Sequence, residues 1–281
     1  MNAPLPPPPG LRRVEVLRHE GDAQRPDRDW VIDEAPVALV YNGVSHVVML
    51  ATPSALEDFA LGFSLSEGLL HGMDELRDLR IEQAGAGAGT GWSGGWSVHL
   101  EVSPRAFERL RAQRRQLAGR TGCGLCGIDS LAAFEQGLPS RRLAPSDSPR
   151  SVAVRRALLA LPAAQALQAH SGACHAAAWA TPEGELVCVR EDVGRHNALD
   201  KLIGALARQG ALPPLEQAAG ADGVAVVSSR ASHEMVSKCV RVGLGTLGAI
   251  SAPTSLAIEL AQRSGLQLFG FCRGDSVVAY A

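Results

Sequence analysis

The chain has few cysteines and no excess of positive charge, and both shortages exclude classes of protein. Six cysteines are spread over 281 residues, which is too sparse for the disulfide framework of a small secreted domain. The formal net charge of -2 and the isoelectric point near 6.4 argue against a general nucleic-acid binder, because such proteins usually carry a basic balance. Any basic surface must therefore be local.

Long apolar runs are also missing. The stretches 157–180 and 242–258 lack charged residues, but polar residues and proline interrupt the first, and glycines and Pro253 interrupt the second. Neither stretch predicts a membrane span. The opening residues, MNAPLPPPPGLRR, lack the basic start and apolar core of a signal peptide. We therefore expect a cytoplasmic protein that contacts no membrane and no nucleic acid.

The N-terminal part predicts a tail followed by a small α+β subdomain. Residues 1–35 are rich in proline, arginine and aspartate without periodicity, which predicts a flexible tail. The subdomain is expected from 36 to 120. In it, Asn42-Gly43 separates two apolar runs and predicts a tight hairpin, because both residues tolerate positive φ. Thr52 is expected to cap a helix that covers this hairpin.

Further along, a glycine-rich stretch at 84–96 predicts a loop between strands, and WSVHLEV predicts the second of these strands. The helix expected at 104–120, PRAFERLRAQRRQLAGR, carries six arginines against one glutamate. It places positive charge next to a loop that contains two cysteines. A solvated helix face is the alternative interpretation of this charge.

From about residue 150 the pattern changes to repeated strand-then-helix units, and we expect an α/β domain over 145–281. Three strands lead through short polar turns into helices, and these turns are EDVGRHN (191–197), SSRAS (228–232) and SAPTS (251–255). In open α/β sheets, ligands bind at the carboxyl ends of strands, where helix N-termini offer unpaired amides to anions. The three turns should therefore line one cleft. The first of the three helices is expected to end near Gly210.

The stretch RTGCGLCGIDS contains Cys123 and Cys126, and several interpretations of this pair are possible. A structural zinc site needs a second Cys or His pair at short spacing, and no second CxxC is present. A thioredoxin-like pair opens a helix soon after a strand, whereas this pair follows an arginine-rich helix. A third interpretation is that both thiols are inert. Inert thiols usually pack against neighbouring side chains, and the flanking glycines supply none.

What remains is an accessible loop in which guanidinium groups and glycine amides favour the thiolate. We interpret it as a sulfur relay. Cys123 would hold an outer sulfane sulfur as a persulfide, and Cys126 would share or release that sulfur by exchange.

Five motifs in this order resemble one known family. They are CGLCG (123–127), EDVGRHNALDK (191–201), SSRASHEMVSK (228–238), SAPTSLAIELA (251–261) and GFCRGDSVVAY (270–280). From about residue 36 to the end, the chain is similar to the formate dehydrogenase accessory sulfurtransferase family, also called the FdhD type. The resemblance implies that sulfur from a cysteine desulfurase is carried as a persulfide. It also implies the recipient, the molybdenum or tungsten bis-guanine-dinucleotide cofactor of formate dehydrogenase, which is bound as a substrate.

The resemblance assigns roles to individual residues. Cys123 matches the persulfide-bearing cysteine and Cys126 its partner. The cofactor-binding stretch of the family matches Phe271, Cys272, Arg273, Gly274, Asp275 and Ser276. Further nucleotide contacts are expected from Ser229, Arg230, Ser251, Thr254, His196 and Asn197. Arg230 and Arg273 lie in turns that suit bidentate phosphate contacts, and each fits a surface ion pair equally well. Helix capping explains Asn197 about as well as a nucleotide contact does. A homodimer without a metal of its own is expected.

The resemblance also implies an α/β fold class. It consists of a C-terminal cytidine-deaminase-like mixed sheet with flanking helices, preceded by the smaller α+β subdomain, with the CxxC loop at 121–144 between them. Zinc-dependent deamination needs H-x-E and a later P-C-x-x-C, and no P-C-x-x-C is present in this chain, because the CxxC at 123–126 lacks the preceding proline. A nucleoside deaminase is therefore disfavoured. A non-catalytic chaperone that only binds the cofactor stays open, although a pure binder needs no nucleophile.

Lysine is almost absent from the chain. Of 27 basic residues only Lys201 and Lys238 are lysines, and both fall inside the motifs. Lysine is a compact point charge where arginine is a wide planar fork, so both sites are interpreted as rejecting the fork sterically. The alternatives are chance or, for Lys238, an i,i+4 pair with Glu234.

Overall fold

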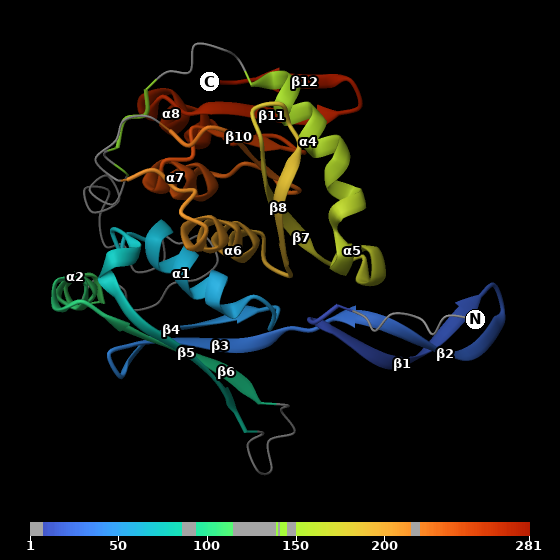
Figure 1. Cartoon of the computed structure of the whole chain (residues 1–281). Helices are drawn as coiled ribbons and strands as arrows, with labels where there is room; N and C mark the ends of the chain where they lie inside the picture. The colour runs from blue at the N-terminus through green and yellow to red at the C-terminus, as the bar shows by residue number, and fades with distance from the viewer. Residues whose placement is uncertain (1–7, 86–93, 115–138, 140, 145–149, 215–219) are drawn as a thin grey trace.

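The computed structural model of the chain describes residues 8–85, 94–114, 139, 141–144, 150–214 and 220–281 (Figure 1). The strands are β1 (Leu11–Glu20), β2 (Ala23–Ile32), β3 (Ala35–Tyr41), β4 (Val44–Ala51), β5 (Leu76–Ala84), β6 (Gly95–Val102), β7 (His175–Ala180), β8 (Leu186–Asp192), β9 (Val224–Val227), β10 (Thr246–Ala249), β11 (Gln267–Arg273) and β12 (Ser276–Ala279). The helices are α1 (Leu56–Ser66), the short 3-10 helix η1 (Met73–Glu75), α2 (Pro104–Arg114), α4 (Ser151–Ala164), α5 (Ala166–Ser171), α6 (Arg195–Arg208), α7 (His233–Val242) and α8 (Ser255–Ser264). Among the described residues, no helix is long and apolar enough to cross a membrane.

The C-terminal part is built on a mixed six-stranded sheet in the order β12-β11-β10-β9-β7-β8. Strands β9, β10 and β11 run parallel, and the other neighbours pair antiparallel. Alternate side chains of a strand face opposite sides. In β9, Val224 and Val226 pack with α4, while Ala225 and Val227 join the larger core that contains α6, α7 and α8. The expected mixed sheet with flanking helices is confirmed, and its likeness to cytidine deaminases stays a prediction.

The N-terminal part forms a four-stranded sheet in the order β4-β3-β6-β5. Helix α1 lies between this sheet and α6 (Figure 1). Its buried side chains, such as Phe59 and Leu61, belong to the same cluster as Leu199 and Leu202 of α6. The two parts of the chain therefore share one continuous hydrophobic core.

Helices α1 and α6 cross so closely that glycine is required on both. A Cβ atom on Gly62 would lie 1.6 Å from the carbonyl oxygen of Asp200, and one on Gly204 would lie 1.9 Å from that of Asp58. Only a residue without Cβ allows two backbones to approach in this way.

Several local predictions are confirmed. Asn42 and Gly43 have φ angles of 46° and 76° and join the antiparallel strands β3 and β4. The strand over WSVHLEV is β6, and the arginine-rich helix is α2 as far as Arg114. Helix α6 is followed by Gly210 at a φ of 68°.

The predicted cap of α1 was wrong. The helix begins at Leu56, after Ala55 in the left-handed conformation, and not directly after Thr52. The hydroxyl of Thr52 instead accepts a hydrogen bond from the backbone N–H of Val193 at 3.1 Å. A contact distant in sequence thus takes the side chain that a local cap would have used.

The N-terminal segment, which was expected to be a flexible tail, is where the structure differs most from the prediction. Residues 11–32 form the antiparallel strands β1 and β2, and Figure 1 shows this hairpin projecting from the body. Its charged residues pair across the strands, with Arg18 and Asp27 2.8 Å apart and the Arg13 guanidinium 5.6 Å from the centre of the Trp30 ring. Such cross-strand pairs stabilise a hairpin, and the composition alone concealed them.

Candidate functional site

The three polar turns after β8, β9 and β10 lie at one edge of the six-stranded sheet. Ala231 and Pro253 form a parallel bridge between the second and third turns, and the N–H of Thr254 donates to the carbonyl of Ala231 at 3.1 Å. The first turn joins them through His196, whose Nε2 lies 2.8 Å from Oε2 of Glu234. The sequence-based expectation that these turns come together is confirmed by these contacts. That they line a cleft stays a prediction.

The expected nucleotide-binding residues in these turns have different surroundings. Arg230 is exposed, whereas Ser229 is buried and donates from its hydroxyl to the carbonyl of Arg230 at 3.0 Å. The side chain of Thr254 caps α8 by accepting from the N–H of Ala257. Ser251 is half-buried and accepts at its carbonyl from the N–H of Phe271 at 3.3 Å.

His196 and Asn197, both in the first turn of α6, also differ from each other in their surroundings. The side chain of His196 is half-buried and meets Glu234. Asn197 is buried, and its amide donates to the carbonyl of Leu50 at 2.8 Å and to Oδ1 of Asp192 at 3.0 Å. Both amide hydrogens of Asn197 are therefore engaged inside the protein.

The stretch 271–276 has its residues on two sides of the sheet. Phe271 is 44% exposed and has a φ of 49°, within an irregularity of the β11–β12 pairing. A bulky residue at positive φ is a genuine outlier and costs conformational energy. Phe271 lies beside Ser251 at the edge that carries the turns.

The next residues of this stretch face α4. Cys272 is buried in the core cluster of α4, and the exposed Asp275 pairs with Arg155 of α4 at 2.5 Å. Cys272 and Gly274 line a cavity of about 280 Å³ together with Ile250 and side chains of α4. Ser276 is exposed at the start of β12, and only the backbone of Arg273 is described.

The four described cysteines are poorly suited to nucleophilic chemistry. Burial raises the pKa of the Cys174 and Cys272 thiols to about 11 and that of Cys239 to about 12, and it also raises the pKa of Cys188. A thiol with a raised pKa stays protonated near neutral pH, and the thiolate is the nucleophile. Cys188 and Cys239 are buried, whereas Cys174 is half-buried. The predicted carriers Cys123 and Cys126 lie outside the described residues.

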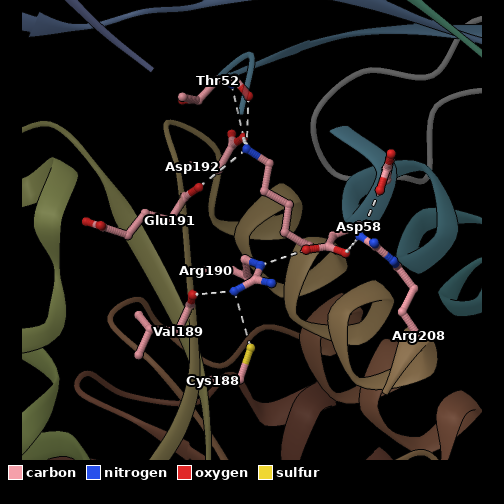
Figure 2. A network of polar contacts seen from close by, with 10 residues as sticks. Thr52, Asp58, Cys188, Val189, Arg190, Glu191, Asp192 and Arg208 are labelled. Carbon is pink, nitrogen blue, oxygen red and sulfur yellow. Dashed lines mark hydrogen bonds and ion pairs between the residues drawn. The ribbon is translucent and has the colours of Figure 1, made fainter. Parts of the chain in front are cut away.

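The ammonium of Lys201 belongs to a buried network with Thr52, Glu191 and Asp192, three residues that are labelled in Figure 2. Its ammonium lies 2.7 Å from Oδ2 of Asp192, 2.9 Å from the carbonyl of Thr52 and 3.4 Å from that of Glu191. Both Lys201 and Asp192 are fully buried. Three donors thus meet three acceptors, whereas an arginine would bring five donors to the same place. This fits the interpretation that the site rejects the arginine fork.

Asp192 is the centre of this network. Its Oδ1 accepts from the N–H of Gly194 at 2.8 Å and from Asn197, while Oδ2 accepts from the N–H of Thr52 at 3.0 Å and from Lys201. The carboxylate therefore fixes the backbone that presents Arg195 and His196 at the edge of the sheet.

Lys238 forms a second buried pair. Its ammonium lies 2.8 Å and 3.0 Å from the two carboxylate oxygens of Asp200, 2.9 Å from Glu67 and 2.8 Å from the hydroxyl of Ser66. Burial acts to lower the pKa of Lys238, but the charges of Asp200 and Glu67 outweigh it and raise the pKa. The alternative of an i,i+4 pair with Glu234 was wrong, because Glu234 pairs with His196.

The fold and this edge define a class of protein: a mixed-sheet α/β protein whose polar strand-to-helix turns meet at one end of the sheet. A sequence model described as the FdhD/NarQ family matches residues 32–281. The chain belongs to this family, which confirms the resemblance of its motifs.

Similar proteins point the same way. The chain is 49% identical over 279 residues to the sulfur carrier protein FdhD of Variovorax paradoxus, covering 99% of this chain and 91% of the relative. It is 50% identical over 253 residues to the protein of that name from Cupriavidus necator, covering 90% and 82%. A crystal structure assigned to a formate dehydrogenase accessory protein from Desulfotalea psychrophila matches with a TM-score of 0.65, 20% identity and 96% coverage of both chains. That last likeness supports the fold alone.

Sequence reasoning missed the residues that organise the site. Asp192, Asp200 and Thr52 were not among the expected site residues, although the first two lie inside the quoted motifs. The signal that pointed toward them was the placement of the two lysines, since each lysine turned out to be the partner of one of these aspartates.

Proposed function

We propose that this protein is a sulfur carrier that accepts sulfur from a cysteine desulfurase as a persulfide on Cys123. The recipient is the molybdenum or tungsten bis-guanine-dinucleotide cofactor that formate dehydrogenase needs. The observation that carries the proposal is the family membership over residues 32–281, with relatives named sulfur carrier proteins. The raised pKa values of the four described thiols support it by leaving Cys123 and Cys126 as the candidates for nucleophilic sulfur.

The loading step is a thiol exchange. The Cys123 thiolate attacks the outer sulfur of the persulfide on the desulfurase, a new S–S bond forms on Cys123, and the desulfurase cysteine leaves as a thiolate. No net oxidation occurs, because one persulfide replaces another. Attack of Cys126 on the outer sulfur would move it to Cys126 by the same chemistry.

The edge formed by the three turns is the candidate site for the guanine dinucleotide. The helices α6, α7 and α8 all begin at this edge, and helix N-termini bind phosphate through free amides and the helix dipole. Arg195 is half-buried and Arg230 exposed there. An exposed aromatic ring at Phe271 adds a surface for stacking.

A persulfide-loading experiment tests the proposal. After incubation with a cysteine desulfurase and cysteine, intact-mass spectrometry should find the added mass of one sulfur atom on this protein. Cys123→Ala should lose this adduct and the ability to activate formate dehydrogenase. Cys126→Ala should keep the adduct and lose part of the activation, because solvent thiols can replace a relay thiol.

Cys174→Ala is the matched control, because its raised pKa leaves little thiolate, and it should load normally. Normal activation of formate dehydrogenase by Cys123→Ala would rule out Cys123 as the carrier. A non-catalytic chaperone is the second candidate, and a wild-type protein that binds cofactor without ever carrying sulfur would establish it.

Nucleotide binding at the edge should depend on charge. We expect the affinity for GDP to fall with added salt, because charged contacts to phosphate are screened. Arg273→Ala should weaken binding more than Arg273→Lys, since lysine retains the charge but loses the bidentate fork. Calorimetry over a range of salt concentrations measures both effects. An affinity for GDP that changes neither with salt nor with Arg273→Ala would contradict the assignment.

A further inference from the structure

One carboxylate at the edge of the sheet is left with an unused oxygen. Glu234, in the first turn of α7, has a side chain that is 24% exposed, and its Oε2 lies 2.8 Å from Nε2 of His196. Among the described residues, no hydrogen-bond donor contacts its other oxygen, Oε1. The carboxylate is thus held by one side and open on the other.

The neighbouring carboxylates are fully engaged. Asp192 accepts four hydrogen bonds, two at each oxygen. Glu191 accepts from the N–H groups of Leu167 and Gln168 at 2.8 Å and 2.9 Å, one at each oxygen. Asp200 is buried against Lys238. Glu234 is therefore the carboxylate of this edge, within the described residues, that can take on a ligand.

Glu234 is also ionised at neutral pH. Burial acts to raise its pKa, but the contact with His196 and the positive charge of Arg195 outweigh burial and hold the pKa of Glu234 below its usual value. An ionised carboxylate is purely an acceptor of hydrogen bonds. It can accept two parallel N–H donors from a planar partner. Each oxygen then accepts one hydrogen bond, or Oε1 accepts both.

A negative charge beside three helix N-termini poses a problem for a nucleotide site. Like charges repel, so Glu234 weakens binding of phosphate groups placed next to it. The charge is compatible with a nucleotide ligand when it faces the base. Guanine presents two adjacent donors, N1–H and the 2-amino group, on one edge, and a carboxylate matches both.

We propose that Glu234 is the specificity-determining residue that accepts the N1–H and 2-amino hydrogens of a guanine base, which deepens and rests on the proposed nucleotide site. His196 lies against the carboxylate from the neighbouring helix, with its Nε2 2.8 Å from Oε2. The phosphates then face the helix starts and the arginines, away from Glu234. Specificity for guanine follows, because a base without these donors leaves a desolvated carboxylate unpaired.

The test compares three diphosphates that differ at one position of the base. GDP carries the 2-amino donor, inosine diphosphate lacks it, and xanthosine diphosphate has a carbonyl acceptor there. In calorimetry with the full chain, the unchanged protein should bind GDP about tenfold more tightly than inosine diphosphate, since one unmatched acceptor costs about that factor. Xanthosine diphosphate should bind more weakly still.

Glu234→Gln supplies the decisive variant. Glutamine offers one acceptor and one donor, which suits the N1–H and the 2-carbonyl of xanthine. The variant should lose about tenfold in GDP affinity and prefer xanthosine diphosphate. Binding of that ligand also demonstrates that the variant is folded. The matched control is Glu259→Gln, an exposed carboxylate on α8, which should keep the ranking of the unchanged protein.

The outcomes separate the two proposals. If the unchanged protein does not bind GDP, the proposed nucleotide site fails and this inference with it. If it binds GDP but does not distinguish inosine diphosphate, or if Glu234→Gln retains the preference for GDP over xanthosine diphosphate, this inference alone is overturned.

Discussion

Replacing Lys238 by methionine is expected to lower the free energy of unfolding by about 3–5 kcal/mol, the range found when one partner of a buried ion pair is removed. Lys238 and Asp200 are 6% and 1% exposed. In the variant, Asp200 keeps the hydroxyl of Ser66 as a donor at 2.6 Å but loses the cation that contacts both of its oxygens. Urea unfolding followed by circular dichroism measures the change.

Two further variants test the cause of this loss. The double variant Lys238→Met/Asp200→Asn removes both charges and should recover part of the stability, because a neutral amide costs less to bury than a lone carboxylate. Arg263→Met removes an exposed cation on α8 and should change stability by no more than about 0.5 kcal/mol. A cost below about 1 kcal/mol for Lys238→Met would mean that the pair behaves as a solvated surface ion pair.

Gly204→Ala is expected to destabilise the protein by about 3 kcal/mol, at the upper end of the cost of overpacking. In an exposed helix the same substitution stabilises by about 1 kcal/mol, because alanine is the better helix former. Here the added Cβ would lie 1.9 Å from the carbonyl oxygen of Asp58, so α1 and α6 must move apart. Thermal and urea unfolding would measure the effect.

Gly245→Ala is the matched control. Its added Cβ would come no closer than 3.8 Å to a neighbouring atom, and its φ is not positive. This substitution should leave stability nearly unchanged. If Gly204→Ala proved as stable as Gly245→Ala, the close crossing of α1 and α6 would not be a requirement of the fold.

What could be predicted from the sequence follows the range of the interactions involved. The hairpin at Asn42-Gly43 and the end of α6 at Gly210 depend on residues next to each other, and both were predicted. The β1–β2 hairpin depends on pairs such as Arg18 with Asp27. In the sequence alone these charged residues indicate a solvated tail, because the pattern does not show that they pair across two strands. The cap of α1 failed because Thr52 bonds to residues about 140 positions away.

The candidate site shows the same division. The meeting of the three turns follows from a rule about strand ends, and it was predicted. The pairs His196–Glu234 and Lys238–Asp200 join residues 38 positions apart in different helices, and no local pattern encodes which acid meets which base. The two lysines gave a hint of position only. The roles of Cys123 and Cys126, outside the described residues, stay predictions from the motif.

The shared core of α1 and α6 has a consequence for cooperativity. Helix α1 comes from the N-terminal half of the chain, yet its buried side chains pack with those of α6, and its Asp58 pairs with Arg190 of β8 and Arg208 of α6. Neither sheet can lose α1 without exposing apolar surface and unpaired charges. A cut in the connection between the sheets would therefore yield two fragments that need each other to fold, as in a protein that melts in one step.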